Sequence, residues 1–283
     1  MTLILLSILC STANQLLFKL FARIQVAALP AIVVNYLVAF GLGAWLNRNG
    51  PALNSLPLFQ LQLLAAVQGG VLAGCFLLMS TVTRRNGVAV AAVSARLAVV
   101  IPVAAAFVLY GDSIAGTKIA GILLALGSLI LLKPDNGGGL RQSGGLRMPL
   151  YLFAAFGFNL AYTKWIQARF LPPDTYHYYL TFCFLWAFAW GVFALLLRRH
   201  DRRVPLRAAV AGVVLGINNY GAIFFLIAAL AQPRWESSVV FPIVSVSVVV
   251  LSFFGGTLLF GERLTLKKSA AVVLGGLALM LIR

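Results

Sequence analysis

Three basic residues lie inside long apolar stretches of the sequence: Lys19, Arg96 and Lys164. Arg96 is the deepest of them, and if its stretch crosses a membrane, an arginine at the centre costs about 2.5 to 3.5 kcal/mol. A planar guanidinium binds carboxylate or phosphate bidentately, so an anionic ligand group in a wet cavity would be a suitable partner. The alternative is that Arg96 bonds backbone carbonyls freed near Pro102. The acidic residues all lie in polar junctions or at stretch ends: Asp112, Asp135, Asp174, Asp201, Glu236 and Glu262.

Each of the two lysines follows an asparagine by five residues, Asn14 before Lys19 and Asn159 before Lys164. Both lysines are about one turn from a stretch end, where a long side chain can reach the membrane surface. Their recurrence at matched positions favours a cavity instead. The asparagines either line that cavity or hydrogen bond between helices. A five-residue step turns a helix by about 140°, so the Asn and Lys of one pair cannot face one spot.

Two further polar groups complete the candidate set. Amides at lipid depth need partners, which favours a role for Asn218, Asn219 and the adjoining Tyr220. His177 lies among the tyrosines at the start of the predicted span 176–197, a pattern also typical of the membrane interface. Its imidazole either belongs to a site or is simply solvated. The predicted substrate-binding residues are Arg96, Lys19, Lys164, Asn14, Asn159, Asn218, Asn219, Tyr220 and His177.

Catalytic and metal-binding signatures are missing from the sequence. It has two histidines, no HExxH, no GxSxG and no glycine-rich phosphate loop, and its three cysteines lie singly in apolar runs. We therefore expect no enzyme, no metal and no cofactor. Asp112 and Glu262 follow glycine at similar junctions, and we expect each carboxylate to cap the helix that follows it.

The composition indicates a membrane protein. Of 283 residues, 61% are hydrophobic and 10% charged, against about 25% charged in soluble domains. A membrane-spanning helix needs about 20 apolar residues, and the start lacks the basic segment of a cleaved signal peptide. Ten spans are predicted, near residues 2–22, 29–47, 58–82, 87–110, 114–132, 148–169, 176–197, 206–230, 236–260 and 265–282.

The sequence also contains an internal repeat. A polar, glycine-rich linker at 134–147 separates residues 1–133 from 148–283, and each half has five predicted spans. YGDSIAGTK from Tyr110 aligns with FGERLTLKK from Phe260, an offset of 150 residues. An odd number of spans per copy reverses the second copy in the membrane. The predicted fold is an all-α bundle of ten transmembrane helices in two inverted five-helix repeats around a central cavity.

Basic residues set the expected orientation. The net charge is +16, and 14 of the Lys and Arg residues lie in alternate loops, against 5 in the other loops and the C-terminus. We take the first set, which includes RRHDRR at 198–203, as cytoplasmic, with both termini outside the inner (plasma) membrane. These charges orient spans, so no nucleic-acid partner is expected. The pairs Gly70 with Gly74 and Gly212 with Gly216 have the spacing of close helix packing.

The ten spans, the inverted repeats and the ending LFGERLTLKKSAAVVLGGLALML resemble the EamA-type transporters of the drug/metabolite transporter superfamily. The resemblance covers nearly the whole chain and is most specific at Gly111-Asp112 and Gly261-Glu262. It implies a basket of helices around a central cavity, and export or exchange of small metabolites. Many members place their termini inside, and here we follow the charge count instead.

One departure bears on the substrate. Small multidrug exporters, relatives with one four-helix unit, use a membrane-embedded glutamate to exchange protons for cationic drugs. Asn14 and Asn159 hold the comparable positions and are neutral. The intramembrane basic residues are more similar to those of the triose-phosphate translocators, which bind anions.

We therefore expect a secondary transporter of a small organic anion or amphoteric solute, working by alternating access. One alternative is an exporter of neutral or cationic solutes in which Arg96 is purely structural. Another is a non-transporting lipid-binding or scaffold protein. The expected partners are a small-molecule substrate and membrane lipid, with a monomer favoured over a dimer.

Overall fold

A computed structural model describes residues 1–48, 58–101, 116–131, 145–170, 176–197, 204–230, 237–262 and 265–281. Regular structure in these residues is entirely α-helical. The ten helices described are α1 (Thr2–Arg23), α2 (Ala28–Leu46), α3 (Leu58–Asn86), α4 (Val88–Leu97), α6 (Gly116–Leu131), α7 (Arg147–Phe170), α8 (Tyr176–Leu197), α9 (Leu206–Leu230), α10 (Ser237–Phe260) and α11 (Leu266–Leu281).

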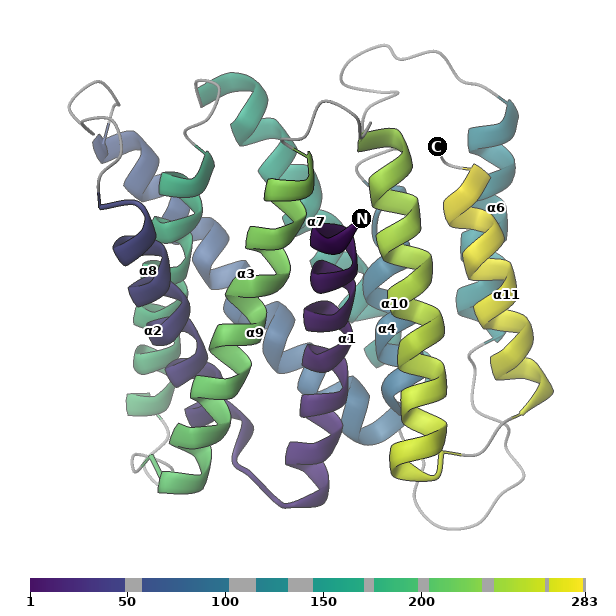
Figure 1. Cartoon of the computed structure of the whole chain (residues 1–283), viewed down its shortest axis with the longest axis horizontal. Helices are drawn as coiled ribbons and strands as arrows, with labels where there is room; N and C mark the ends of the chain where they lie inside the picture. Colours follow the sequence, from purple (N-terminus) through teal and green to yellow (C-terminus); the bar gives the residue numbers. More distant parts are fainter. Residues whose placement is uncertain are drawn as a thin grey trace.

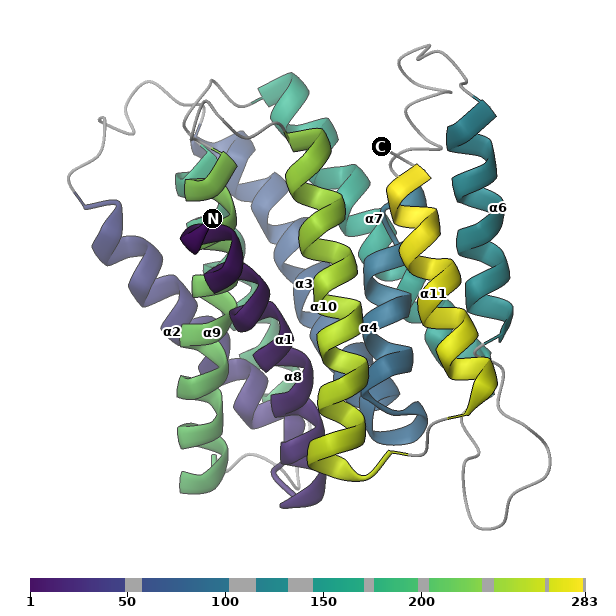
Figure 2. The same cartoon turned by 45° about the vertical axis from the view of Figure 1, so that its right-hand side comes forward.

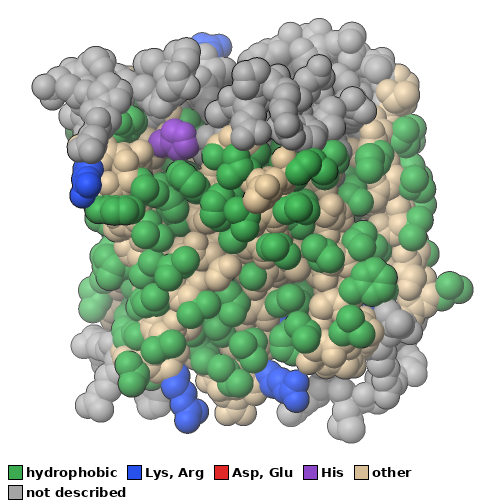
Figure 3. All heavy atoms as spheres, viewed as in Figure 1, with side chains coloured by type: hydrophobic (Ala, Val, Ile, Leu, Met, Phe, Trp, Pro, Cys, Tyr) green, Lys and Arg blue, Asp and Glu red, His purple; other side chains and the backbone are tan. Residues whose placement is uncertain are grey.

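The described helices form a multi-pass membrane protein. Six of them, α1, α2, α3, α8, α9 and α10, are long and apolar enough to cross a bilayer. In Figure 3 apolar side chains cover the middle of the visible face, and most visible Lys and Arg side chains lie near its margins. Such a band is the expected surface of a protein whose flanks contact lipid.

The helix positions agree closely with the predicted spans, with one informative exception. The stretch at 87–110 was predicted as one helix, but α4 ends at Leu97 and a turn follows at Ala98 and Val99. Pro102 has no N–H to donate to the carbonyl of Ala98 four residues earlier. The Ile101 N–H donates to that carbonyl instead, at 3.1 Å. The prediction of an uninterrupted helix here was wrong, and Arg96 lies in the last turn of α4.

The helices run roughly parallel and antiparallel in an elongated bundle (Figure 1). In Figure 1 α2 and α8 lie towards one end of the long axis, the α6–α11 pair at the other, and α1, α4 and α10 between them; in Figure 2 α2 and the α6–α11 pair still lie at opposite ends. Both termini lie in the upper half of these views. α1 and α10 finish, and α4 begins, at the opposite end, which we call the junction end.

Close packing of α9 on α2 depends on two glycines. A Cβ on Gly212 would lie 2.5 Å from the Ala31 carbonyl oxygen, and one on Gly216 would lie 2.7 Å from that of Asn35. The predicted close-packing role is confirmed for this pair. It is wrong for the pair Gly70 and Gly74, because no described residue of another helix lies within 4 Å of a Cβ at Gly74.

Candidate functional site

The junction after α10 folds back on itself through a glycine. Gly261 has φ +64°, a left-handed conformation that glycine adopts without steric cost. Its N–H donates to the Thr257 carbonyl at 3.0 Å, and the Glu262 N–H donates to the Gly256 carbonyl at 3.2 Å. This turn directs the Glu262 carboxylate towards neighbouring helices.

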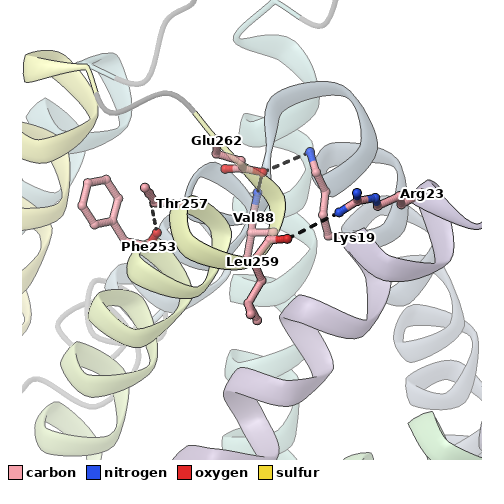
Figure 4. A network of polar contacts seen from close by, with 7 residues as sticks. All are labelled: Lys19, Arg23, Val88, Phe253, Thr257, Leu259 and Glu262. Carbon is pink, nitrogen blue, oxygen red and sulfur yellow. Dashed lines mark hydrogen bonds and ion pairs between the residues drawn. The ribbon is translucent and has the colours of Figure 1, made fainter.

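Glu262 joins three helices at this junction end (Figure 4). One of its oxygens, Oε1, accepts the Val88 backbone N–H at the start of α4 at 2.9 Å, and lies 3.0 Å from Nζ of Lys19 on α1. Gly87, with φ +99°, leaves room for this carboxylate, because a Cβ there would lie 2.7 Å from Oε2. An anion at a helix N-terminus is favoured by the helix dipole.

This geometry corrects one prediction. Glu262 was expected to cap α11, the helix that follows it, but its carboxylate caps α4. α11 has a cap of its own: the Lys268 N–H donates to the Thr265 hydroxyl at 3.3 Å. Asp112, the repeat-related acid, lies outside the described residues.

Lys19 and Val88 share one carboxylate and therefore mark a common level in the bundle. At a rise of about 1.5 Å per residue, Arg96 lies roughly 12 Å above that level along α4, and Thr12 roughly 10 Å above it along α1. Ser252 lies about 12 Å from the end of α10 at Phe260 by the same measure. Since α1, α4 and α10 pack against one another, these three residues lie at a similar height, about 10 to 12 Å from the junction end.

Side chains between about 6 and 12 Å above the level of Glu262 are short of hydrogen-bond partners. Arg96 is partly buried, and no hydrogen bond or ion pair joins its guanidinium to any described residue. Buried oxygens without a partner among the described residues belong to Thr12, Asn14 and Gln15 on α1 and to Ser252 on α10. A buried unsatisfied polar group costs about 1 to 3 kcal/mol. We call Thr12, Asn14, Gln15, Arg96 and Ser252 the polar layer.

The layer is a level in the bundle and not a single pocket. Thr12 and Gln15 are three residues apart and share one buried face of α1. On α4, Ser94 also has a buried hydroxyl without a described partner, but it lies about 200° around the helix from Arg96. Only part of this polar surface therefore faces any one ligand.

Lys19 lies below the layer, paired with Glu262. Its ammonium is bound by a carboxylate. Lys19 therefore neither extends to the membrane surface nor lies unpaired in a cavity. The side chain of Lys164, its repeat partner, lies outside the described residues.

Asn159 belongs to a separate polar cluster between α3, α7 and α8. Its Oδ1 accepts from Nε2 of Gln68 at 3.4 Å, and the same Nε2 donates to the Thr163 hydroxyl. The Tyr179 hydroxyl donates to Oε1 of Gln68 at 2.7 Å. Here the amide hydrogen bonds between helices, the second of the two roles considered for Asn159.

The remaining predicted residues are dispersed. Asn219 is buried and donates to Oδ1 of Asn35 on α2 at 3.3 Å, while Asn218 donates to the Val214 carbonyl of its own helix at 2.9 Å. Tyr220 is buried and packs at 6.3 Å, between ring centroids, from Phe184. His177 is partly buried at the start of α8. Of the predicted residues, Arg96 and Asn14 lie on helices that contact each other, about 12 and 8 Å above the level of Glu262.

Sequence reasoning missed Thr12, Gln15, Ser252 and Gln68. The two glutamines did carry a signal, because a neutral amide is also rare in an apolar stretch. Single hydroxyls carry none, since they commonly bond the carbonyl one turn earlier. Thr257 does so, donating to the Phe253 carbonyl at 3.0 Å (Figure 4). No group of three or more His, Cys, Asp or Glu side chains in the described residues could hold a metal ion.

Comparison with known proteins supports the fold. No protein-family model matches the chain. An uncharacterized protein of Haemophilus influenzae is 24% identical over 279 residues, which cover 93% of this chain and 90% of that protein. A solved crystal structure superposes with a TM-score of 0.61 at 18% identity, covering 97% of this chain and 96% of its own. The whole bundle is thus similar to a fold already seen by experiment.

Proposed function

We propose that the chain is a secondary transporter that binds a small organic anion, or an amphoteric solute with an anionic group, at the polar layer. The observation that carries this proposal is the Arg96 guanidinium, which lies between packed helices without a partner among the described residues. An anionic ligand group would supply the counter-charge and accept two parallel hydrogen bonds.

The neutral members of the layer suit the rest of such a ligand. The amide oxygens of Asn14 and Gln15 are buried acceptors without described partners, and they would receive hydroxyl or N–H groups of the solute. A site built to hydrogen bond rejects analogues that leave its polar groups unpaired. Arg96 would hold the charge, and these amides would discriminate among anions.

Inverted repeats form part of the proposal, and the helix contacts support them. If α1, α2, α3, α4 and α6 correspond to α7, α8, α9, α10 and α11, exchanging the halves should leave the pattern of packing partners unchanged. α1 packs on α9 and α10, and its counterpart α7 packs on α3 and α4. Likewise α2 packs on α9 and α8 on α3, while α6 pairs with α11. This is the architecture expected of an EamA-type transporter with ten spans.

We further propose that the junction end faces the cytoplasm. Arg23, Arg84, Arg85 and Arg147 belong to junctions that the structure brings to this end. Both termini would then lie outside the plasma membrane, as the positive-inside rule requires.

Reconstitution into liposomes tests the function. The purified full-length chain should give saturable uptake of a radiolabelled anion from a panel of carboxylates and phosphate esters, and the Arg96→Met chain should not. Flux limited to neutral or cationic solutes would favour the exporter with a structural Arg96. Binding without flux would favour a scaffold role.

A further inference from the structure

The polar contacts that link α1, α4 and α10 lie at the junction end. Among the described residues they are Lys19 with Glu262, Val88 with Glu262, and the Arg23 guanidinium, which donates to the Leu259 carbonyl at 3.5 Å. Higher up, the three helices meet through apolar contacts and the unsatisfied atoms of the polar layer. Towards its N-terminus α1 is bound to another helix, since the Ser7 hydroxyl donates to the Ala222 carbonyl on α9 at 2.8 Å.

Glu262 is central to this arrangement because one carboxylate serves two partners. It neutralises Lys19 on α1 and caps the first turn of α4. The contact is not sealed from solvent: the side chains of Lys19 and Glu262 are 24% and 10% exposed. A charged contact near water costs less to break than one in a dry interior, because the separated charges are rehydrated.

We propose that Glu262 is a latch that closes the bundle beneath the polar layer at the junction end. Release of Lys19 and the α4 N-terminus lets α1, α4 and α10 separate there and opens the layer to that side of the membrane. The proposal rests on the proposed function, since alternating access requires such a closure. It differs from a static cap, which would stabilise the fold without controlling access to the layer.

Thiol accessibility in membrane vesicles tests the latch without any substrate. In a chain whose three native cysteines are replaced by alanine, Thr12→Cys places a reporter in the layer and Arg207→Cys, in a separate chain, marks the junction end. The reagent is a charged, membrane-impermeant methanethiosulfonate. With Glu262 intact the reporter should react slowly; with Glu262→Gln or Lys19→Met it should react at least tenfold faster, and only from the side that labels the Arg207→Cys marker.

Arg85→Met is the control. It removes an exposed charge in the last turn of α3, at the same end of the bundle, and leaves the three contacts between α1, α4 and α10 in place, so the labelling rate should stay within about twofold. Size-exclusion profiles in detergent check that each variant folds.

A second experiment replaces the ion pair with a reversible covalent bridge. The chain carries Lys19→Cys, Glu262→Cys and the Ser252→Cys reporter, and a short bifunctional thiol reagent bridges positions 19 and 262. Labelling of the reporter is compared before and after the bridge is reduced. Bridging should abolish access to the layer, and reduction should restore it. Unchanged labelling in Glu262→Gln and in the bridged chain would overturn the latch. If the Glu262→Gln chain with unchanged labelling still transported an anion in liposomes, the proposed function would stand without the latch. Failure of the latch and failure of the proposed function are therefore distinguishable.

Discussion

Replacing Arg96 with methionine separates the functional role of this residue from a structural one. Methionine keeps an unbranched, flexible stem of similar length and loses only the charge and the donors. An arginine at the centre of a membrane helix costs about 2.5 to 3.5 kcal/mol on insertion scales. Because Arg96 is only partly buried, we expect a stability gain of about 1 to 2 kcal/mol, within that upper bound.

A structural role gives the opposite sign. If the guanidinium satisfied buried acceptors, its removal would leave them unpaired and cost about 3 to 5 kcal/mol, as when one partner of a buried pair is deleted. The two expectations differ in direction and by several kcal/mol, which is well within the resolution of thermal unfolding in detergent.

The assay pairs unfolding with anion flux for the same protein preparation. Arg96→Met should unfold at a higher temperature than the parent and transport at least tenfold more slowly. Arg96→Lys should fold and bind more weakly, since an ammonium lacks the bidentate fork. Arg207→Met, at an exposed position at the start of α9, should change neither quantity. A strongly destabilised Arg96→Met chain, or one that transports like the parent, refutes the counter-charge role.

Three further outcomes are expected. Gly216→Val should destabilise the bundle by about 1 to 3 kcal/mol through overpacking, since a Cβ there would lie 2.7 Å from the Asn35 carbonyl oxygen. Gly41→Val is the control, because no described residue of another helix lies within 4 Å of a Cβ there. Equal melting temperatures for both variants would contradict the close approach. Gln68→Leu should cost about 1 to 3 kcal/mol by leaving Tyr179 and Asn159 without a partner, whereas Asn218→Leu, which loses a bond within its own helix, should be nearly neutral; the reverse order of melting temperatures would count against the cluster. In intact cells an impermeant thiol reagent should label Arg48→Cys but not Arg207→Cys, and labelling of position 207 alone would invert the proposed orientation.

Much of the architecture follows from the sequence because the bilayer limits the choices. A helix must satisfy its own backbone in lipid, so each apolar stretch of sufficient length predicts a helix of known type. The stretches at 176–197 and 206–230 coincide with α8 and α9. That Arg96 has no carboxylate partner among the described residues could also be predicted, since every acid lies in a junction or at a stretch end. The break after Leu97 could have been predicted from Pro102, whose missing N–H ends the regular pattern.

Only the tertiary structure determines which residues of different helices contact one another. Nothing near Glu262 in the sequence indicates that its carboxylate caps α4, 174 residues away in the chain, or that Lys19 is its counter-ion. The same holds for Asn159, which accepts a hydrogen bond from Gln68, and for the oxygens of Thr12 and Gln15, which have no partner among the described residues. The physical reason is that local sequence determines whether a segment is helical and how deep a residue lies along it. Which face meets which neighbour depends on the packing of all the helices together, and only that packing shows which polar groups of the described residues are satisfied and which are not.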